Sequence, residues 1–153
     1  MQLTRAADYA IRVMIHMAGL PAGTTVRLRT LAIAVTVPES FLAKVLQTLT
    51  RAGLVMSRRG PDGGFELLPS SMQASILDVI DAIEGPVQMN SCLGEDGCCE
   101  RKEWCPAHSL WAEAQIAMLT VLSRDTIGEL ALRAERNKQA LPKIATIAEA
   151  ATV

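Results

Sequence analysis

All four cysteines of the chain lie in one short stretch, at Cys92, Cys98, Cys99 and Cys105, and His108 is three residues further on. The residues between them are polar and include glycines, which is typical of an exposed loop. Thiolates gathered in this way bind a metal centre or form an oxidisable pair. We therefore expect a loop that holds a metal or senses redox state, on a scaffold that reports its condition.

Three chemistries fit the loop. An iron–sulfur cluster needs three or four thiolates on a flexible backbone, which Gly94 and Gly97 supply. Zinc could bind four cysteines, or three with His108, although the adjacent pair Cys98-Cys99 departs from the usual spacing of zinc sites. The same pair could be oxidised without any metal. Spacing favours the cluster and leaves zinc and the thiol switch open.

Cys105 has a special position because Pro106 follows it. Proline suits the first turn of a helix, so we expect Cys105 to be the N-cap residue of the next helix. The positive end of a helix lowers the pKa of a thiol there and favours the thiolate that metals bind.

The two halves of the chain differ in charge. Residues 1–70 contain eight Lys or Arg and four Asp or Glu, whereas residues 71–153 contain seven and twelve. A basic first half indicates a polyanionic partner for that half. No apolar run is long enough for a signal peptide or a membrane span. We therefore expect a cytoplasmic protein with no membrane partner, and cytoplasmic thiols are mostly reduced.

The apolar periodicity predicts helices over residues 5–20, 29–35, 41–52, 75–83, 110–122 and 127–136. Two strands flank a turn rich in Gly, Pro and Asp at residues 60–64. Two short helices joined near Pro38 form a helix-turn-helix, and the hairpin after them forms a wing. The expected fold is mostly α, a winged helix-turn-helix DNA-binding domain with a long C-terminal dimerisation helix. Its expected divisions are the DNA-binding domain (1–86), a cluster-binding loop (87–109), dimerisation helices (110–136) and a flexible tail (137–153).

The helix predicted over residues 110–122 is apolar on nearly every side, with ten apolar residues out of thirteen. Such a helix must be covered all round. A small winged-helix domain is too small to cover it, so we assign it to a homodimer interface. The alternative is a central core helix of a monomer.

Two groups of residues are expected to contact double-stranded DNA. The start of the second helix of the helix-turn-helix would face base edges and phosphates, and the wing would enter the minor groove or hold its phosphates. Phe41 could instead pack in the core, and Arg58 could be a solvated strand residue. The candidates are Pro38, Glu39, Ser40, Phe41, Lys44, Arg58, Arg59 and Gly60.

Several motifs together resemble one family, the Rrf-two family of bacterial transcription regulators. They are residues 1–4 (MQLT), 8–10 (DYA), 51–55 (RAGLV), 59–64 (RGPDGG), and the cysteine loop followed by Leu110-Trp111. The resemblance covers residues 1–136. It implies a homodimeric winged-helix repressor or activator, and several members hold an iron–sulfur cluster with three cysteines of this loop. By this resemblance a [4Fe–4S] cluster is favoured over a [2Fe–2S] cluster.

Two branches of the family are similar to different parts of the chain. The nitric-oxide sensor NsrR resembles the N-terminus, which implies Asp8 of the other subunit as fourth ligand. The cluster-assembly regulator IscR resembles the segment from Cys105 to Trp111, which implies His108 instead. The ordinary alternatives are surface ion pairs of Asp8 with the arginines beside it, and a solvated His108.

This sequence also departs from both branches. The family pattern has five residues between consecutive cysteines, and the doubled pair lets either Cys98 or Cys99 be the middle ligand. Ala43 stands where the IscR type has a glutamate, so its operator specificity does not carry over.

The expected function is a DNA-binding transcription regulator, a repressor, and not an enzyme. It would bind a pseudo-palindromic operator as a homodimer, and a cluster that senses nitric oxide, iron or redox state would set its DNA affinity. The alternative is a metal-free or zinc-containing thiol switch that uses Cys98 and Cys99.

Overall fold

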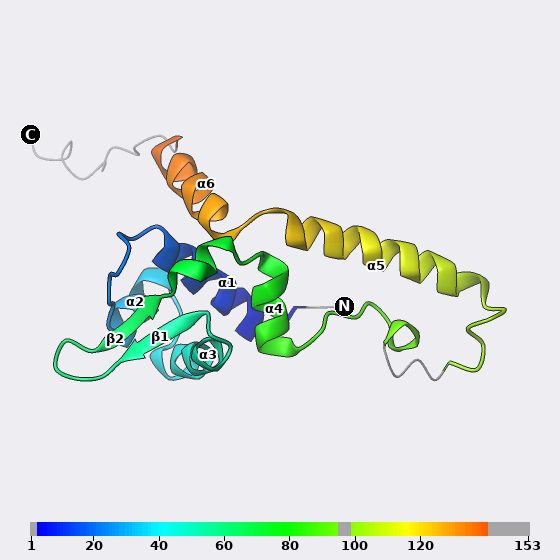
Figure 1. Ribbon diagram of the computed structural model, residues 1–153, viewed down its shortest axis with the longest axis horizontal. Coiled ribbons are helices and arrows are strands. Elements are labelled where there is room, and N and C mark those ends of the chain that lie inside the picture. The colour runs from blue at the N-terminus through cyan, green and yellow to red at the C-terminus, as the bar shows by residue number, and fades with distance from the viewer. Residues whose placement is uncertain (1–2, 95–98, 141–153) are drawn as a thin grey trace, which may run out of the picture.

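The computed structural model describes residues 3–94 and 99–140. A helical body and a projecting arm make up its shape (Figure 1). The element order is α1 (Arg5–Ala18), α2 (Leu28–Val35), α3 (Glu39–Arg51), β1 (Val55–Arg58), β2 (Gly64–Leu67), the 3-10 helix η1 (Pro69–Gln73), α4 (Ile76–Glu84), the 3-10 helix η2 (Ser91–Leu93), α5 (Pro106–Arg124) and α6 (Ile127–Ala140). The mostly α winged-helix fold expected from the sequence is confirmed.

Helix α1 lies at the centre of the body, where α2, α3, α4 and α6 all contact it. Thr4 caps its start by accepting a hydrogen bond from the Ala7 N–H, and it donates two bonds to the Glu84 carboxylate at the end of α4. One face of α1 carries the buried side chains, because apolar residues recur every three or four positions. These are Ala7, Ala10, Val13, Met14 and Met17.

Helices α2 and α3 form the helix-turn-helix on one side of α1 (Figure 1). The turn between them passes through Thr36 in the left-handed conformation, with φ 57°. Pro38 is the N-cap residue of α3 and not part of its first turn, since the helix begins at Glu39. Burial of Leu42, Leu46 and their neighbours fixes the opposite face of α3 outward.

The wing is the antiparallel hairpin β1–β2, with Val55 opposite Leu67 and Arg58 opposite Gly64. Val26, just before α2, pairs with Phe65 of β2 through an isolated antiparallel β-bridge. The wing is therefore bonded to the segment before α2, in addition to being connected to the end of α3 by the chain.

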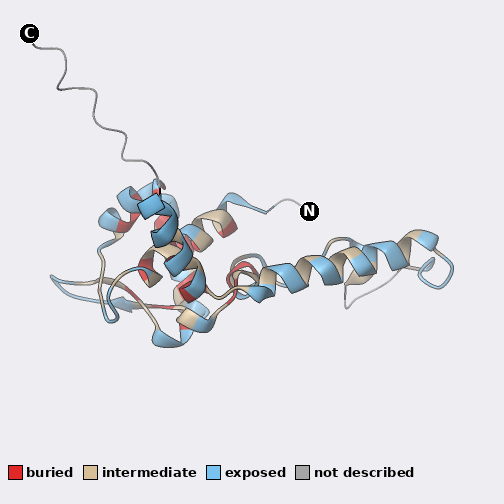
Figure 2. Ribbon diagram, turned by 90° about the horizontal axis from the view of Figure 1, so that it is seen from above, coloured by how far each residue is buried: buried red, intermediate tan, exposed pale blue. Residues whose placement is uncertain are grey.

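The arm consists of α5 and the segment that leads to it, and it extends away from the body (Figure 1). None of the α5 residues is buried, and the burial colours of Figure 2 show this along its length. The helix starts four residues before the predicted Leu110, because Cys105 and Pro106 provide its cap and first turn. A core helix of a monomer, the alternative left open above, is therefore wrong for the described chain.

Helix α6 returns from the arm and packs on α1 and η1. Thr126 and Glu129 form a reciprocal capping box at its start, as the sequence indicated for residues 125–126. The helix continues to Ala140, so residues 137–140 are helical and not part of a loosely ordered tail. The backbone there continues the hydrogen bonding of α6. The rest of the predicted tail, 141–153, lies outside the described residues.

No single described helix combines the length and hydropathy of a membrane span. Only α2 and α3 taken together, across a bend of 107°, have the length and composition of one.

Candidate functional site

The exposed side of α3 presents the predicted DNA contacts of the recognition helix. Pro38, Glu39, Ser40 and Lys44 are all exposed, and the buried residues of α3 lie on the other face. The packing of α3 therefore leaves its N-terminal turn free for a groove of DNA, which is the arrangement that helix-turn-helix proteins use.

Phe41 lies at the edge of this surface and is 39% exposed. Its ring meets the Tyr9 ring edge to face, with 5.4 Å between the centroids. The Arg12 guanidinium lies over the same Tyr9 ring, 5.9 Å from its centroid. Phe41 is thus partly exposed but packed against Tyr9, so it joins α1 to the first turn of the recognition helix.

The two wing arginines have different surroundings. Arg58 forms an ion pair with Glu66 across the hairpin, and Glu66 is a buried residue with 7% exposure. Burying a carboxylate is costly unless it is paired, so Arg58 stabilises the wing and is not simply a solvated strand residue. Arg59 and Gly60 are exposed, and Arg59 forms no ion pair with any described residue.

Glu66 and Arg27 were missed by the sequence analysis. The signal for Glu66 lay in the hairpin register, because Glu66 faces Met56 and is diagonal to Arg58 on the same side. Arg27 donates a hydrogen bond to the carbonyl of Pro61 in the wing turn. Nothing in the local pattern of residues 26–28 indicates that contact.

The cysteine loop lies where the arm begins. Cys92 is in η2, which contacts α5, and Cys105 is the N-cap residue of α5 as expected. Cys92, Cys99 and Cys105 are free thiols of intermediate burial. Cys98 lies outside the described residues. The Met89 N–H donates to the Gln115 side chain at 2.9 Å, so the strand of chain before Cys92 is fastened to α5.

The described residues do not bring three or more His, Cys, Asp or Glu side chains together into a site that could hold a metal ion. The chemistry of the donors nevertheless fits a cluster. Thiols come from both sides of the loop, and the Nε2 of His108 is shielded from solvent with no hydrogen-bond partner among the described residues. A shielded imidazole nitrogen with nothing to bind is suited to a metal.

Asp8 forms the ion pair with Arg12 that its spacing of four residues allows, with 2.8 Å between the Asp8 Oδ2 and the Arg12 Nη2. The pair is about half exposed. Asp8 and the cysteines are therefore not joined within one chain among the described residues.

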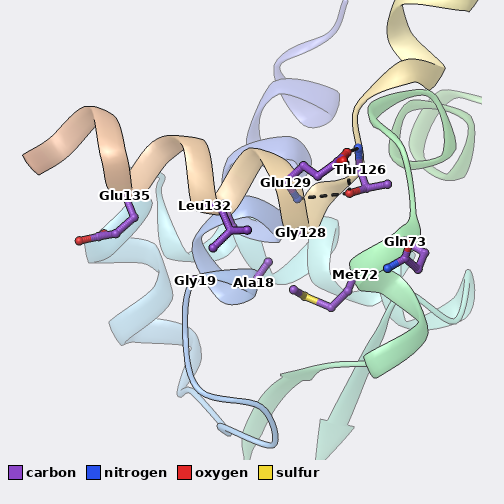
Figure 3. A pocket seen from close by; sticks show the side chains of 10 residues that line it. Ala18, Gly19, Met72, Gln73, Thr126, Gly128, Glu129, Leu132 and Glu135 are labelled. Carbon is purple, nitrogen blue, oxygen red and sulfur yellow. Dashed lines mark hydrogen bonds between the residues drawn. The ribbon is translucent and has the colours of Figure 1, made fainter. Parts of the chain in front are cut away.

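A groove of about 390 Å³ lies between the end of α1, η1 and α6 (Figure 3). Its floor is apolar, with Ala18, Met72 and Leu132, while Glu129 binds Thr126 at the rim. None of the predicted DNA or metal residues lines it. The groove is therefore separate from the chemistry that the sequence indicates.

One partly buried titratable group, His16, lies beside a second cavity. Burial lowers the pKa of His16 from its usual value of 6.5, and the nearby Lys138 ammonium lowers it further. Arg12 and Glu135 line the same cavity. His16 therefore favours its neutral form in the folded chain.

Comparison with known proteins identifies the family. Residues 3–133 match the model of the Rrf2 family, described as iron-dependent transcriptional regulators. The transcriptional regulator IscR of Vibrio cholerae is 33% identical over 130 residues, which cover 85% of this chain and 75% of that protein.

Solved structures agree with this match. The global cysteine regulator CymR of B. subtilis superimposes with a TM-score of 0.72 at 26% identity, over 87% of this chain and 98% of that one. CymR of Staphylococcus aureus, solved in an oxidized form, has a TM-score of 0.67 at 25% identity, over 86% of this chain and 96% of that one. With a helix-turn-helix, a wing and regulators as relatives throughout, the chain belongs to the Rrf-two (Rrf2) family of transcription regulators.

Proposed function

We propose that the chain is a cytoplasmic, homodimeric repressor whose affinity for double-stranded operator DNA is set by an iron–sulfur cluster in the cysteine loop. The signal would be nitric oxide, iron supply or redox state, all of which act on cluster iron. The observation that carries the proposal is the loop itself. Free thiols lie on both sides of it, and a shielded imidazole nitrogen lies one turn beyond Cys105.

The proposed ligands are Cys92, Cys105, one of Cys98 and Cys99, and His108. Three thiolates give the soft donors that iron–sulfur clusters need, and the fourth, non-thiolate ligand would leave one labile position. His108 is preferred over Asp8 because the Asp8 carboxylate already has Arg12 as a partner. When bound, the cluster would supply iron that reacts with the signal, while the residues around it hold the loop against α5.

A homodimer follows from the exposed apolar side chains of α5. Leu110, Ile116 and Val121 are 65%, 66% and 58% exposed in the single chain. Apolar side chains on both sides of one helix favour a partner surface. A second copy of the same helix would cover them in a two-fold interface and bring two recognition helices onto one operator.

The state of the loop could reach DNA through packed helices. Helix α4 contacts α5, α3 and α1, and Tyr9 of α1 contacts Phe41 of the recognition helix. A loop change that shifts α5 would therefore move elements in contact with α3. A differential of about 1–3 kcal/mol between two arrangements is enough for a 5- to 150-fold change in DNA affinity.

The test is to purify the full chain without oxygen, rebuild it with iron and sulfide, and measure bound iron, sulfide and visible absorption. We expect Cys105→Ala to lose the cluster, and only one of Cys98→Ala and Cys99→Ala to lose it. Ser109→Ala, an exposed neighbour, is the matched control and should keep it. A wild-type chain that binds no iron after reconstitution contradicts the proposal.

The fourth ligand has its own test. His108→Ala should alter the visible spectrum and make the cluster easier to lose, whereas Asp8→Ala should leave both unchanged. The opposite pattern would assign the fourth ligand to Asp8 of the partner.

A thiol switch is the second candidate, and the relation to a CymR solved in an oxidized form favours it. Under this function the iron-free protein would lose or gain DNA affinity on mild oxidation, and alanine at Cys98 or Cys99 would abolish the response. An oxidation response in iron-free protein, together with no iron binding, would establish the switch in place of the cluster.

A further inference from the structure

The wing is fixed to the helix-turn-helix by backbone hydrogen bonds. Val26 and Phe65 exchange two of them, each with 2.9 Å between nitrogen and oxygen. The backbones approach so closely there that a Cβ on Gly64 would lie 2.4 Å from the Val26 carbonyl oxygen. The residue after Val26 therefore has a defined position relative to the wing.

That residue is Arg27, the N-cap residue of α2. Its Nη2 donates to the Pro61 carbonyl at 3.0 Å and lies 3.6 Å from the Asp62 Oδ1. Both partners belong to the turn that closes with the Gly63 N–H donating to the Gly60 carbonyl. One side chain at the start of the helix-turn-helix thus reaches the tip of the wing.

Arg27 has no role of its own in capping α2, because its side chain makes no cap hydrogen bond. The salt bridge with Asp62 is exposed, and exposed ion pairs contribute little to stability. We therefore expect the loss of the Arg27 side chain to change where the wing tip lies more than whether the protein folds.

Two side-chain interactions therefore fix the wing. The Arg58–Glu66 pair joins the two strands near the turn, and Arg27 holds the turn itself. In the sequence, Arg59 lies between Arg58 and Pro61, and its side chain is exposed. We propose that Arg27 is a positioning residue for DNA binding, which fastens the wing tip to the start of α2 and so sets where Arg59 meets the DNA backbone. This inference rests on the proposed DNA contact of Arg59 and is independent of the cluster.

The test is a double-mutant cycle on the full chain. The probe is a mixed-sequence DNA duplex of about three helical turns at low salt, with affinity measured by fluorescence anisotropy. Proteins are wild type, Arg27→Ala, Arg59→Ala and the double variant. Arg29→Ala is the matched control, an exposed arginine on α2 that has no ion pair among the described residues.

In the wild-type background, we expect Arg27→Ala to lower DNA affinity about three- to tenfold. In the Arg59→Ala background, the same substitution should lower it less than about twofold, because both residues act through one contact. Arg29→Ala should change DNA affinity by the same factor in the wild-type and Arg59→Ala backgrounds. If Arg27→Ala and Arg59→Ala simply add, Arg27 is an independent phosphate contact and the inference is overturned. If Arg59→Ala alone has no effect, the proposed wing contact fails, and this inference fails with it.

A second readout needs no DNA. In the free protein, the Gly63 amide should exchange with solvent faster in Arg27→Ala than in wild type or Arg29→Ala, since the wing tip is released. The thermal midpoint should change by no more than a few degrees. Equal exchange of Gly63 in all three proteins would overturn the positioning role even if DNA affinity falls.

Discussion

The winged-helix body and the arm differ in how their apolar side chains are covered. In the body, residues from α1, α2, α3, α4 and α6 share one core, and the largest of them are fully buried. In the arm, α5 runs for nineteen residues without one buried side chain. The body is thus complete as a single chain, whereas the arm presents surface that needs something else. A regulator built in this way can change the arm without unfolding the part that binds DNA.

The largest expected effect tests whether the body is self-sufficient. Leu46 of α3 is fully buried in the common core. Leu46→Ala should lower the free energy of unfolding by about 2–5 kcal/mol, since it leaves a cavity that the core fills poorly. Urea unfolding followed by circular dichroism measures the change.

The matched control for this test is Ile33→Ala, because Ile33 is 71% exposed on α2. Its loss should be within about 0.5 kcal/mol. Equal losses at the two positions would show that the body core is not where its stability resides.

The second prediction concerns the arm. Ile116→Glu should raise the dissociation constant of the dimer at least about 30-fold, because the variant would bury a charge in the interface. A change of about 30-fold corresponds to a loss of about 2 kcal/mol of binding free energy, the size expected for an important interface residue. Analytical ultracentrifugation across a concentration series measures this. Ile33→Glu makes the same change at an exposed isoleucine of the body and should leave the dimer intact. A dimer that persists in Ile116→Glu would remove α5 from the interface.

A smaller effect is expected where the wing meets Val26. Gly64→Ala should cost about 1–2 kcal/mol, because the new methyl group forces Val26 and the wing apart. Thermal unfolding measures the cost, and Ser57→Ala, on an exposed position of β1, provides the baseline. A variant as stable as wild type would mean that the Val26–Phe65 bridge contributes nothing to the stability of the body.

The smallest predicted effect depends on pH. Because the pKa of His16 is lowered in the folded state, the unfolded chain binds a proton first as pH falls through 6.5. The contribution of His16 to the free energy of unfolding is therefore fully present above pH 6.5 and is lost progressively as the pH falls below it. Urea unfolding of wild type and His16→Gln at several pH values should show a smaller loss in the variant. Parallel curves for the two proteins would contradict the assignment.

The sequence predicted the body well because its signals are local. The apolar stripe of α1, the proline before α3 and the Gly-rich turn of the wing each depend on neighbouring residues, and the structure has an element at each. The N-cap of α5 at Cys105 was predicted from Pro106, whereas the apolar pattern alone begins at Leu110 and places the start of the helix four residues too late.

Contacts between distant segments were harder to predict. The Asp8–Arg12 pair follows from helical spacing and was expected, but Arg27 and Pro61 are 34 residues apart and nothing in their spacing predicts the contact. The pairing of Arg58 with Glu66 needed the strand register, which depends on the length of the wing turn. Residue type and spacing identify a cysteine loop, but they do not give the relative positions of its thiols, and Cys98 lies outside the described residues.

We propose that the state of the arm sets the affinity of the body for DNA. The most direct measurement compares cluster-loaded and cluster-free forms of one anaerobic preparation, at equal dimer concentration, on a DNA site selected from random sequences by the loaded protein. We expect affinities that differ about 5- to 150-fold. Equal affinities of two forms that differ in bound iron would contradict it.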